Sequence, residues 1–148
     1  MIFLIKAAFR RYLLIFGMGL LPFSFLRVLI LRLCGVSIGK GCYIGFNVAV
    51  DTNFPDLITI GDNVTISHDT VIITHTATPT NSKLSALYKS HSPVSIASGA
   101  WIGVRSIILP GVSIGRNCFI GAGSVVTSNT DNDTLWAGNP CVRKKNLY

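Results

Sequence analysis

The most conspicuous irregularity in the sequence directly follows a histidine. His75 ends the apolar run 71–74, and a polar segment, residues 76–92, comes after it. A neutral imidazole near pH 7 can accept a proton from a hydroxyl group. We therefore take His75 as a candidate general base, although a histidine at a strand end, standing alone, is more often structural.

A second group of residues is suited to phosphate. Arg143, Lys144 and Lys145 are three consecutive cations near the C-terminus, and such side chains bind phosphate groups well. A solvated basic tail is the alternative interpretation. Gly103, Gly121 and the neighbouring alanine are small enough to let a thin ligand approach the main chain.

Several chemistries lack their motifs. The four cysteines form no CxxC pair, which argues against zinc ribbons and thioredoxin-type redox sites. The spacings of His68, His75 and His91 do not fit a zinc hydratase, so we predict no metal. No glycine-rich nucleotide fingerprint, HExxH motif or GxSxG elbow is present.

The element that must position His75 is a six-residue repeat. Aliphatic residues recur at positions 96, 102, 108, 114, 120 and 126, and the same phase appears from 38, 44, 60 and 66. The fifth position of each repeat is small or β-branched. Because neither a helix nor an ordinary strand has period six, each hexad predicts one short strand and a turn, and three hexads close a triangular coil. Coils stack about 4.8 Å apart as parallel strands, which predicts an all-β solenoid.

The N-terminus differs from the rest in composition. The 148-residue chain has a net charge of +7, yet residues 1–40 hold six cations and no acid. Phe25, Leu26, Leu29, Ile30 and Leu33 form the apolar stripe of a predicted helix that stops at a glycine. One interpretation is a helix packed on the protein or on a second subunit. The other is a monotopic segment whose cations meet anionic head groups.

These observations divide the chain into three parts. We expect a helical segment at 1–35, a β-helix at 36–135 with an inserted loop at 76–92, and a basic tail at 136–148. The stretch 12–26 is too short to span a bilayer, and no signal peptide is evident. The cysteines then suggest buried thiols in the cytoplasm, with the inner face of the membrane as a peripheral location. No motif or aromatic platform indicates nucleic-acid binding.

The chain resembles the hexapeptide-repeat acyltransferases, in particular the O-acetyltransferases of the maltose, galactoside and colanic-acid type. The resemblance rests on residues 36–145, on the run AWIGVRSIILPGVSIGRNCFIGAGSVVTSN and on the turn AGNP at 137–140. It implies a left-handed parallel β-helix, acetyl-CoA as co-substrate, a homotrimer and His75 as the general base that deprotonates an acceptor hydroxyl.

The resemblance also suggests binding residues. Asn47 and Asp51 would contact or orient the acceptor, and Trp101 would pack on the acyl end; Asn47 as a turn residue and Trp101 as plain packing are the alternatives. The positions that match the acetyl-CoA groove are Val104, Ala122, Thr127, Ser128, Arg143, Lys144 and Lys145. Ser128 stands where some relatives have a lysine, so one phosphate contact is lost.

The expected function is acetyl transfer to a hydroxyl of a sugar or of a lipid-linked glycan precursor. Two alternatives remain open from the sequence. One is a non-catalytic trimeric scaffold, because fold alone does not give function. The other is an enzyme of the same fold with another acyl donor or an amine acceptor.

Overall fold

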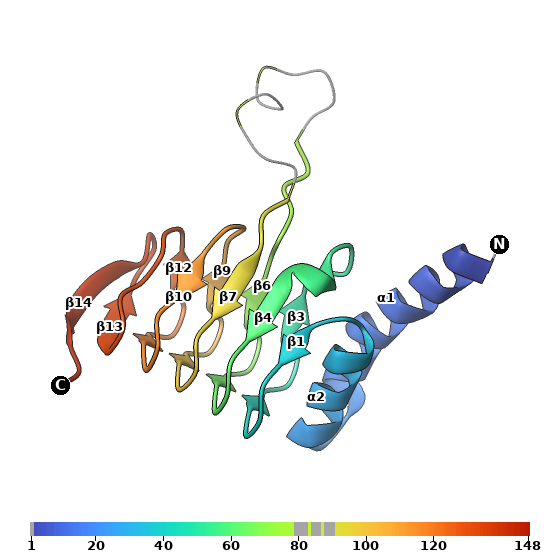
Figure 1. The fold of residues 1–148 in the computed structure, drawn as a ribbon, viewed down its shortest axis with the longest axis horizontal. Coiled ribbons are helices and arrows are strands. Elements are labelled where there is room, and N and C mark those ends of the chain that lie inside the picture. The colour runs from blue at the N-terminus through green and yellow to red at the C-terminus, as the bar shows by residue number, and fades with distance from the viewer. Residues whose placement is uncertain (1, 79–82, 84–86, 88–90) are drawn as a thin grey trace.

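Two helices precede the repeats. In the computed structural model, which describes residues 2–78, 83, 87 and 91–148, α1 spans Ile2–Leu20 and α2 spans Ser24–Leu33 (Figure 1). The α2 helix stops as predicted at Gly35, whose φ is +106°. There the N–H of Val36 bonds to the carbonyl of Leu31 and that of Gly35 to Arg32, which is a Schellman end. None of the described helices is long and apolar enough to cross a bilayer.

The helix α2 buries a different face from the one predicted. Phe25, Leu29 and Leu33 of the predicted apolar stripe are exposed, by 66%, 50% and 73%. The buried face instead contains Arg27, whose Nε donates to the carbonyl of Ile44 at 2.9 Å. Its guanidinium also bonds to the carbonyl of Leu21 and lies 4.2 Å from the Phe46 ring centre. Arg27 therefore stabilises the helix on the β-domain and does not face a membrane.

Most of the large apolar side chains in residues 8–20, the part of α1 whose burial the structure describes, are also exposed. Leu14 and Met18 are buried against the rest of the protein. By contrast, five large apolar side chains are exposed, namely Phe9, Tyr12, Ile15, Phe16 and Leu20. Together the two helices therefore carry an extended apolar surface that the described chain does not cover.

The repeats form four three-sided coils within the described residues. Each coil places one strand in each of three sheets, and the strands pair in parallel with the coils before and after. The first sheet holds β1 (Ser37–Ile38), β4 (Ile58–Ile60), β7 (Val94–Ile96) and β10 (Ser113–Ile114). The second holds β2 (Tyr43–Ile44), β5 (Thr65–Ile66), β8 (Trp101–Ile102), β11 (Phe119–Ile120), β13 (Thr134–Ala137) and β14 (Val142–Asn146). The third holds β3 (Ala49–Val50), β6 (Val71–Ile72), β9 (Ile107–Ile108) and β12 (Val125–Val126).

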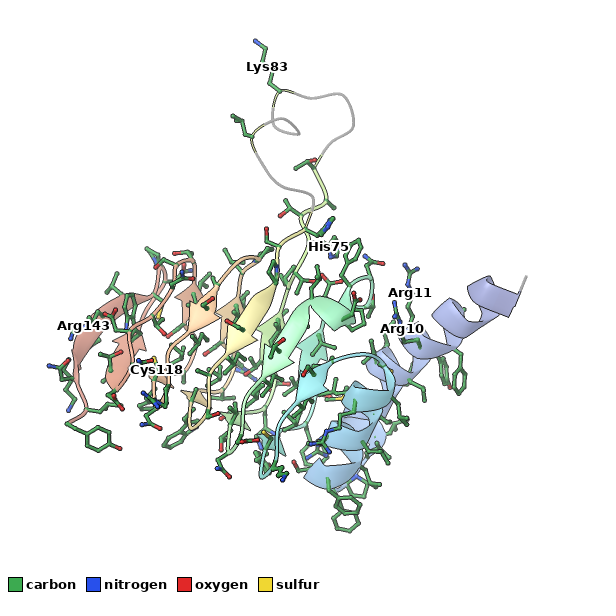
Figure 2. All side chains as sticks on the ribbon, viewed as in Figure 1. Arg10, Arg11, His75, Lys83, Cys118 and Arg143 are labelled. Atoms are coloured by element: carbon green, nitrogen blue, oxygen red, sulfur yellow. The ribbon has the colours of Figure 1, made fainter. Side chains whose placement is uncertain are left out.

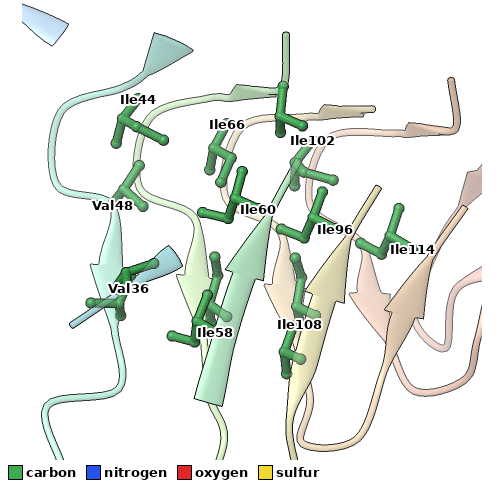
Figure 3. Packing of buried hydrophobic residues seen from close by; sticks show 14 of the residues in the cluster. Val36, Ile44, Val48, Ile58, Ile60, Ile66, Ile96, Ile102, Ile108 and Ile114 are labelled. Atoms are coloured by element: carbon green, nitrogen blue, oxygen red, sulfur yellow. The ribbon is translucent and has the colours of Figure 1, made fainter. Parts of the chain in front are cut away.

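The core follows the hexad pattern. Aliphatic residues from consecutive coils, such as Ile44, Ile66 and Ile102, stack with no exposed surface along the inside of the prism (Figure 3). The fifth hexad positions also point inward, and Val64, Ser106 and others there are fully buried. Buried serines donate to turn carbonyls, as Ser106 Oγ does to the carbonyl of Gly103 at 2.8 Å, so their polarity is satisfied.

The corners use two different backbone properties. The fourth hexad position has positive φ, for example +54° at Asn63 and +67° at Gly41. Several second positions are glycines with ordinary φ that have no room for a side chain. A Cβ on Gly103 would lie 2.6 Å from the main-chain nitrogen of Ala122. Glycine is needed at such positions because the coils approach closely.

The coil is irregular at one corner and at its C-terminal end. Between β3 and β4 the chain forms a short 3-10 helix, η1 (Pro55–Leu57), and between β6 and β7 it leaves as the loop that begins after His75. At the end of the stack, β14 folds back antiparallel onto β13. The segment expected as a basic tail is thus a hairpin, although all five residues of β14 are exposed.

Candidate active site

His75 and Asp51 meet at the corner between the third and first sheets. The Nδ1 of His75 lies 2.5 Å from Oδ2 of Asp51. The carboxylate is fully buried, while the imidazole is 30% exposed. Because a carboxylate beside Nδ1 favours the tautomer with its proton there, Nε2 is left as the basic nitrogen.

The surroundings of Asp51 keep it ionised. Its Oδ2 accepts hydrogen bonds from the N–H of Thr74 at 3.0 Å and from the Thr74 hydroxyl at 2.8 Å, and its Oδ1 accepts the N–H of Asn53 at 2.9 Å. Burial alone would raise the pKa of Asp51, but the hydrogen bonds from His75, Thr74 and Asn53 outweigh it and hold the pKa well below its usual range. The carboxylate of Asp51 has no exposed surface and binds His75, and its role toward an acceptor stays a prediction.

An asparagine that the sequence analysis did not select contacts the basic nitrogen. The side-chain amide nitrogen of Asn53 lies 3.3 Å from Nε2 of His75. The same side chain connects the site to α1, because Arg11 donates to its Oδ1 at 2.5 Å and Arg10 donates to its main-chain oxygen at 3.3 Å. Figure 2 shows Arg10 and Arg11 extending from α1 on the side of the prism where His75 lies.

The spacing of the strands could have identified Asn53. The register pairs Ala49 with Val71 and Val50 with Ile72, an offset of 22 residues. The same offset carries Asn53 to His75. The repeat positions 38 and 60, and likewise 44 and 66, already show this offset in the sequence, although the regular coil repeats every 18 residues and the irregular segment at 50–59 lengthens this one.

A pocket of about 630 Å³ opens beside the imidazole. Its lining includes His75, Ser92, Leu109 and Thr127. Thr127, predicted for acetyl-CoA, thus shares a pocket with the candidate base. A smaller pocket of about 240 Å³ is also lined by His75, together with residues of the third sheet and of the turn after β3. An imidazole that lines two pockets is suited to bringing two substrates together.

Two predicted acceptor residues lie elsewhere. Asn47 occupies a turn between the second and third sheets with φ +54°, and its amide donates to Asp69 at 3.2 Å. It behaves as the turn residue of the alternative interpretation. Trp101 is on the outer face of the second sheet, where its ring stacks on Phe119 at 4.6 Å. Neither joins His75 within the chain.

The residues predicted for acetyl-CoA fall into three places. Val104 and Ala122 are exposed in stacked turns between the second and third sheets, and Thr127 and Ser128 follow β12 at the corner of His75. The three cations lie on β14, where Arg143 contacts Asp131 at 3.4 Å and Asn146 at 2.5 Å. In one chain the base and the turns that would hold the donor therefore occupy different edges of the prism.

The other histidines have structural contacts. Nδ1 of His68 accepts the N–H of Phe46 at 2.9 Å, and its ring stacks on that phenylalanine. The ring of His91 stacks on that of Phe54 at 5.0 Å, and the main chain of His91 forms an isolated antiparallel β-bridge with that of His75. No group of three or more potential metal ligands occurs among the described residues.

With this geometry established, comparison with known proteins shows the family. The profile described as bacterial transferase hexapeptide (six repeats) matches residues 93–128, and that of the hexapeptide repeat of succinyl-transferase matches 30–52 and 35–72. The chain is 37% identical over 107 residues to the galactoside O-acetyltransferase of Escherichia coli, covering 72% of this chain and 51% of that protein. The chain belongs to the hexapeptide-repeat acyltransferases. It spans about half the length of the curated galactoside O-acetyltransferases that it matches.

Solved structures of hexapeptide-repeat enzymes share the fold. A maltose O-acetyltransferase from Clostridium difficile superimposes with a TM-score of 0.63 at 29% identity, covering 97% of this chain and 85% of the other. A hexapeptide-repeat-containing acetyltransferase from Vibrio cholerae, solved with acetyl coenzyme A, gives 0.78 at 24% identity over 97% and 88% of the two chains.

Proposed function

We propose that this hexapeptide-repeat protein is an acetyl-CoA-dependent O-acetyltransferase that acts on a hydroxyl of a sugar or glycan precursor. The observation that carries the proposal is the short contact of His75 with the buried Asp51. This contact makes Nε2 the basic nitrogen of a histidine that lines a pocket. The names of the galactoside and maltose O-acetyltransferases among its relatives support the reaction class.

The proposed reaction is a direct transfer. The acceptor hydroxyl replaces the amide of Asn53 at Nε2 of His75 and gives its proton to that nitrogen as its oxygen attacks the thioester carbonyl carbon. The carbon–sulfur bond then breaks, and the proton passes from Nε2 to the sulfur of coenzyme A. Main-chain N–H groups beside the groove would stabilise the oxyanion that develops. The ionised Asp51 stabilises the imidazolium that exists between these steps.

The active assembly is proposed to be a homotrimer built from left-handed coils, as the resemblance implies. The separation of His75 from Val104 and Ala122 onto different edges supports it. A cyclic trimer can bring one edge of a subunit to another edge of its neighbour. Acetyl-CoA would then lie between subunits, with its phosphates near Arg143, Lys144 and Lys145.

The helices support contact with a membrane surface as part of this proposal. The exposed apolar side chains of α1 and α2 are numerous, and no acidic residue precedes Asp51 in the sequence. Arg27 takes no part in such contact because it is buried.

The test is the release of coenzyme A thiol from acetyl-CoA with a panel of sugars. We expect acceptor-dependent release by the wild type and loss of at least about 10²-fold in kcat for His75→Ala, the lower range for a general base. His68→Gln is the matched control, because that histidine contacts main chain outside the pocket.

Each other result has a defined meaning. Full activity of His75→Ala would refute the mechanism. Binding of acetyl-CoA without turnover on any sugar or amine would remove the sugar acceptor from the proposal. Absence of both binding and turnover would favour the non-catalytic scaffold.

A further inference from the structure

Two arginines beside the proposed base have only neutral partners. Arg10 and Arg11 both donate to Asn53, one to its main-chain oxygen and one to its side-chain oxygen. No ion pair joins either arginine to a carboxylate in the described part of the chain. The Nε of Arg10 is buried and has no hydrogen-bond partner among these residues. Two adjacent guanidinium groups therefore lack a counter-charge.

The nearest acidic group does not neutralise them. The carboxylate of Asp51 is fully buried and is occupied by His75, Thr74 and two main-chain N–H groups. A partly buried charge without a partner is costly, and paired guanidinium groups with spare donors match the oxygens of a phosphate. The chemistry of this corner thus favours an anionic ligand.

The arginine pair is within reach of a ligand that also touches the base. One side-chain amide, that of Asn53, contacts Arg11 through its oxygen and His75 through its nitrogen. The guanidinium of Arg11 and the imidazole of His75 consequently lie on two sides of the Asn53 side-chain amide. A ligand with a hydroxyl at Nε2 can place a nearby phosphate against the arginines.

Arg10 also lines an apolar groove. It has a volume of about 380 Å³ between the two helices, and its lining consists of Phe9, Arg10, Leu13, Leu33 and Cys34. Phe9 and Leu33 on its rim are 62% and 73% exposed. Arg10 is the one charged residue in the lining of this otherwise apolar groove, which makes the groove complementary to an amphiphile with an anionic head group.

We propose that Arg10 and Arg11 bind a phosphate of the acceptor and that the groove holds its hydrocarbon chain. The acceptor is then a sugar joined through phosphate to a lipid. This inference rests on the proposed function, because it assumes that the hydroxyl at His75 belongs to the acceptor. Coenzyme A of the same chain is a poor alternative, since α1 and the cationic strand β14 lie at opposite ends of the stack (Figure 1).

Binding can be tested without knowledge of the sugar. The probe is geranyl phosphate, with geraniol and inorganic phosphate as separate arms, titrated by calorimetry into the full-length protein. We expect geranyl phosphate to bind at least about tenfold more tightly than either arm, and Arg10→Gln/Arg11→Gln to weaken it by about tenfold or more, as expected for charged hydrogen bonds. The single variant Arg11→Gln, at an exposed position, should show part of this loss without a risk to folding.

Matched variants separate this site from general charge and apolarity. Lys40→Gln/Arg116→Gln removes two exposed cations from other corners and should leave binding unchanged. Leu33→Gln should weaken geranyl phosphate binding, whereas Leu29→Gln, on the same helix but outside the groove, should not. Equal binding by the Arg10→Gln/Arg11→Gln protein and the wild type would overturn the proposal. So would inorganic phosphate binding as tightly as geranyl phosphate.

An activity arm keeps this proposal distinct from the proposed function. Geranyl phosphate should inhibit thiol release competitively with the sugar acceptor and not with acetyl-CoA. Competition with acetyl-CoA would assign the arginines to the donor and overturn the inference. Specific binding of geranyl phosphate without any acetyl transfer would instead support the phosphate site at Arg10 and Arg11 and refute the proposed acetyltransferase activity.

Discussion

At the scale of single residues, the chemistry depends on which nitrogen of His75 carries the proton. The buried Asp51 favours the tautomer with the proton on Nδ1 and, in the proposed reaction, would stabilise the imidazolium. An amide at this position can instead donate to Nδ1, which favours the tautomer with the wrong nitrogen protonated. The carboxylate therefore determines whether the base points its lone pair toward the pocket.

We expect Asp51→Asn to lower kcat by about 10²–10⁴-fold, as tautomer errors do in comparable histidine–carboxylate pairs. Binding of acetyl-CoA should remain near the wild-type value, because Asp51 is not exposed to a ligand. Steady-state kinetics and calorimetric titration measure the two effects. Asp69→Asn, at a surface turn, is the control. An unchanged kcat in Asp51→Asn would show that the pair has no catalytic role.

The same carboxylate makes stability depend on pH. Its pKa is depressed in the folded protein, so its stabilising effect is complete above the unfolded value of about 3.9 and is lost as pH falls toward the folded value. Urea unfolding at pH 7, 4 and 3 should show a steep loss of unfolding free energy for the wild type at the acid end. Asp51→Asn should be less stable at pH 7 and lose less on acidification. Equal slopes for the two proteins would contradict this assignment.

At the scale of elements, the spacing of the coils depends on glycines at the second hexad position. We expect Gly103→Ala to lower the unfolding free energy by more than Gly123→Ala. The first places a Cβ 2.6 Å from main chain of the next coil, whereas the second meets nothing within 4 Å. In Gly123→Ala the alanine is strained only by its backbone φ of +68°, and this strain lowers the unfolding free energy by about 1–2 kcal/mol. Chemical denaturation of the two variants gives the comparison, and the reverse order would contradict the close-approach argument.

The elements also show what the sequence could and could not predict. The hexad pattern predicted the strands, the inward residues and the irregular corner of His75, because one rule governs every coil. It could not predict the buried face of α2. A hydrophobicity pattern assigns Arg27 to the surface, and it contains no information about the carbonyls of Leu21 and Ile44 that accept hydrogen bonds from the guanidinium. Asn53 was missed for a similar reason: its register with His75 depends on the length of an irregular segment.

At the scale of the whole molecule, the three outer faces differ. The outward residues of the first sheet are Ser37, Thr59, Ser95 and Ser113, whereas those of the third are Ala49, Val71, Ile107 and Val125. An apolar face between the two edges that the reaction would need is suited to contact with a neighbouring subunit.

We expect sedimentation velocity to give a trimer for the wild type and a smaller species for Ile107→Asp. Ser95→Asp, on the polar first sheet, is the matched control and should stay trimeric. Transfer activity should fall with the trimer, because the donor groove would be incomplete, even though the contact of His75 with Asp51 is retained. A fully active monomer would contradict a site shared between subunits.

The two ends of the coil stack have a further consequence for how the protein behaves in concentrated solution. Stacked parallel strands can add another coil at either end, and thus another molecule, which is the route to filaments. The helices α1 and α2 contact the first coil, so a second molecule cannot dock there in register. At the other end, β14 runs antiparallel and carries Arg143, Lys144 and Lys145 on an edge strand. Like charges on that edge repel a second copy, so the cations that we propose for coenzyme A also protect the molecule from end-to-end polymerisation.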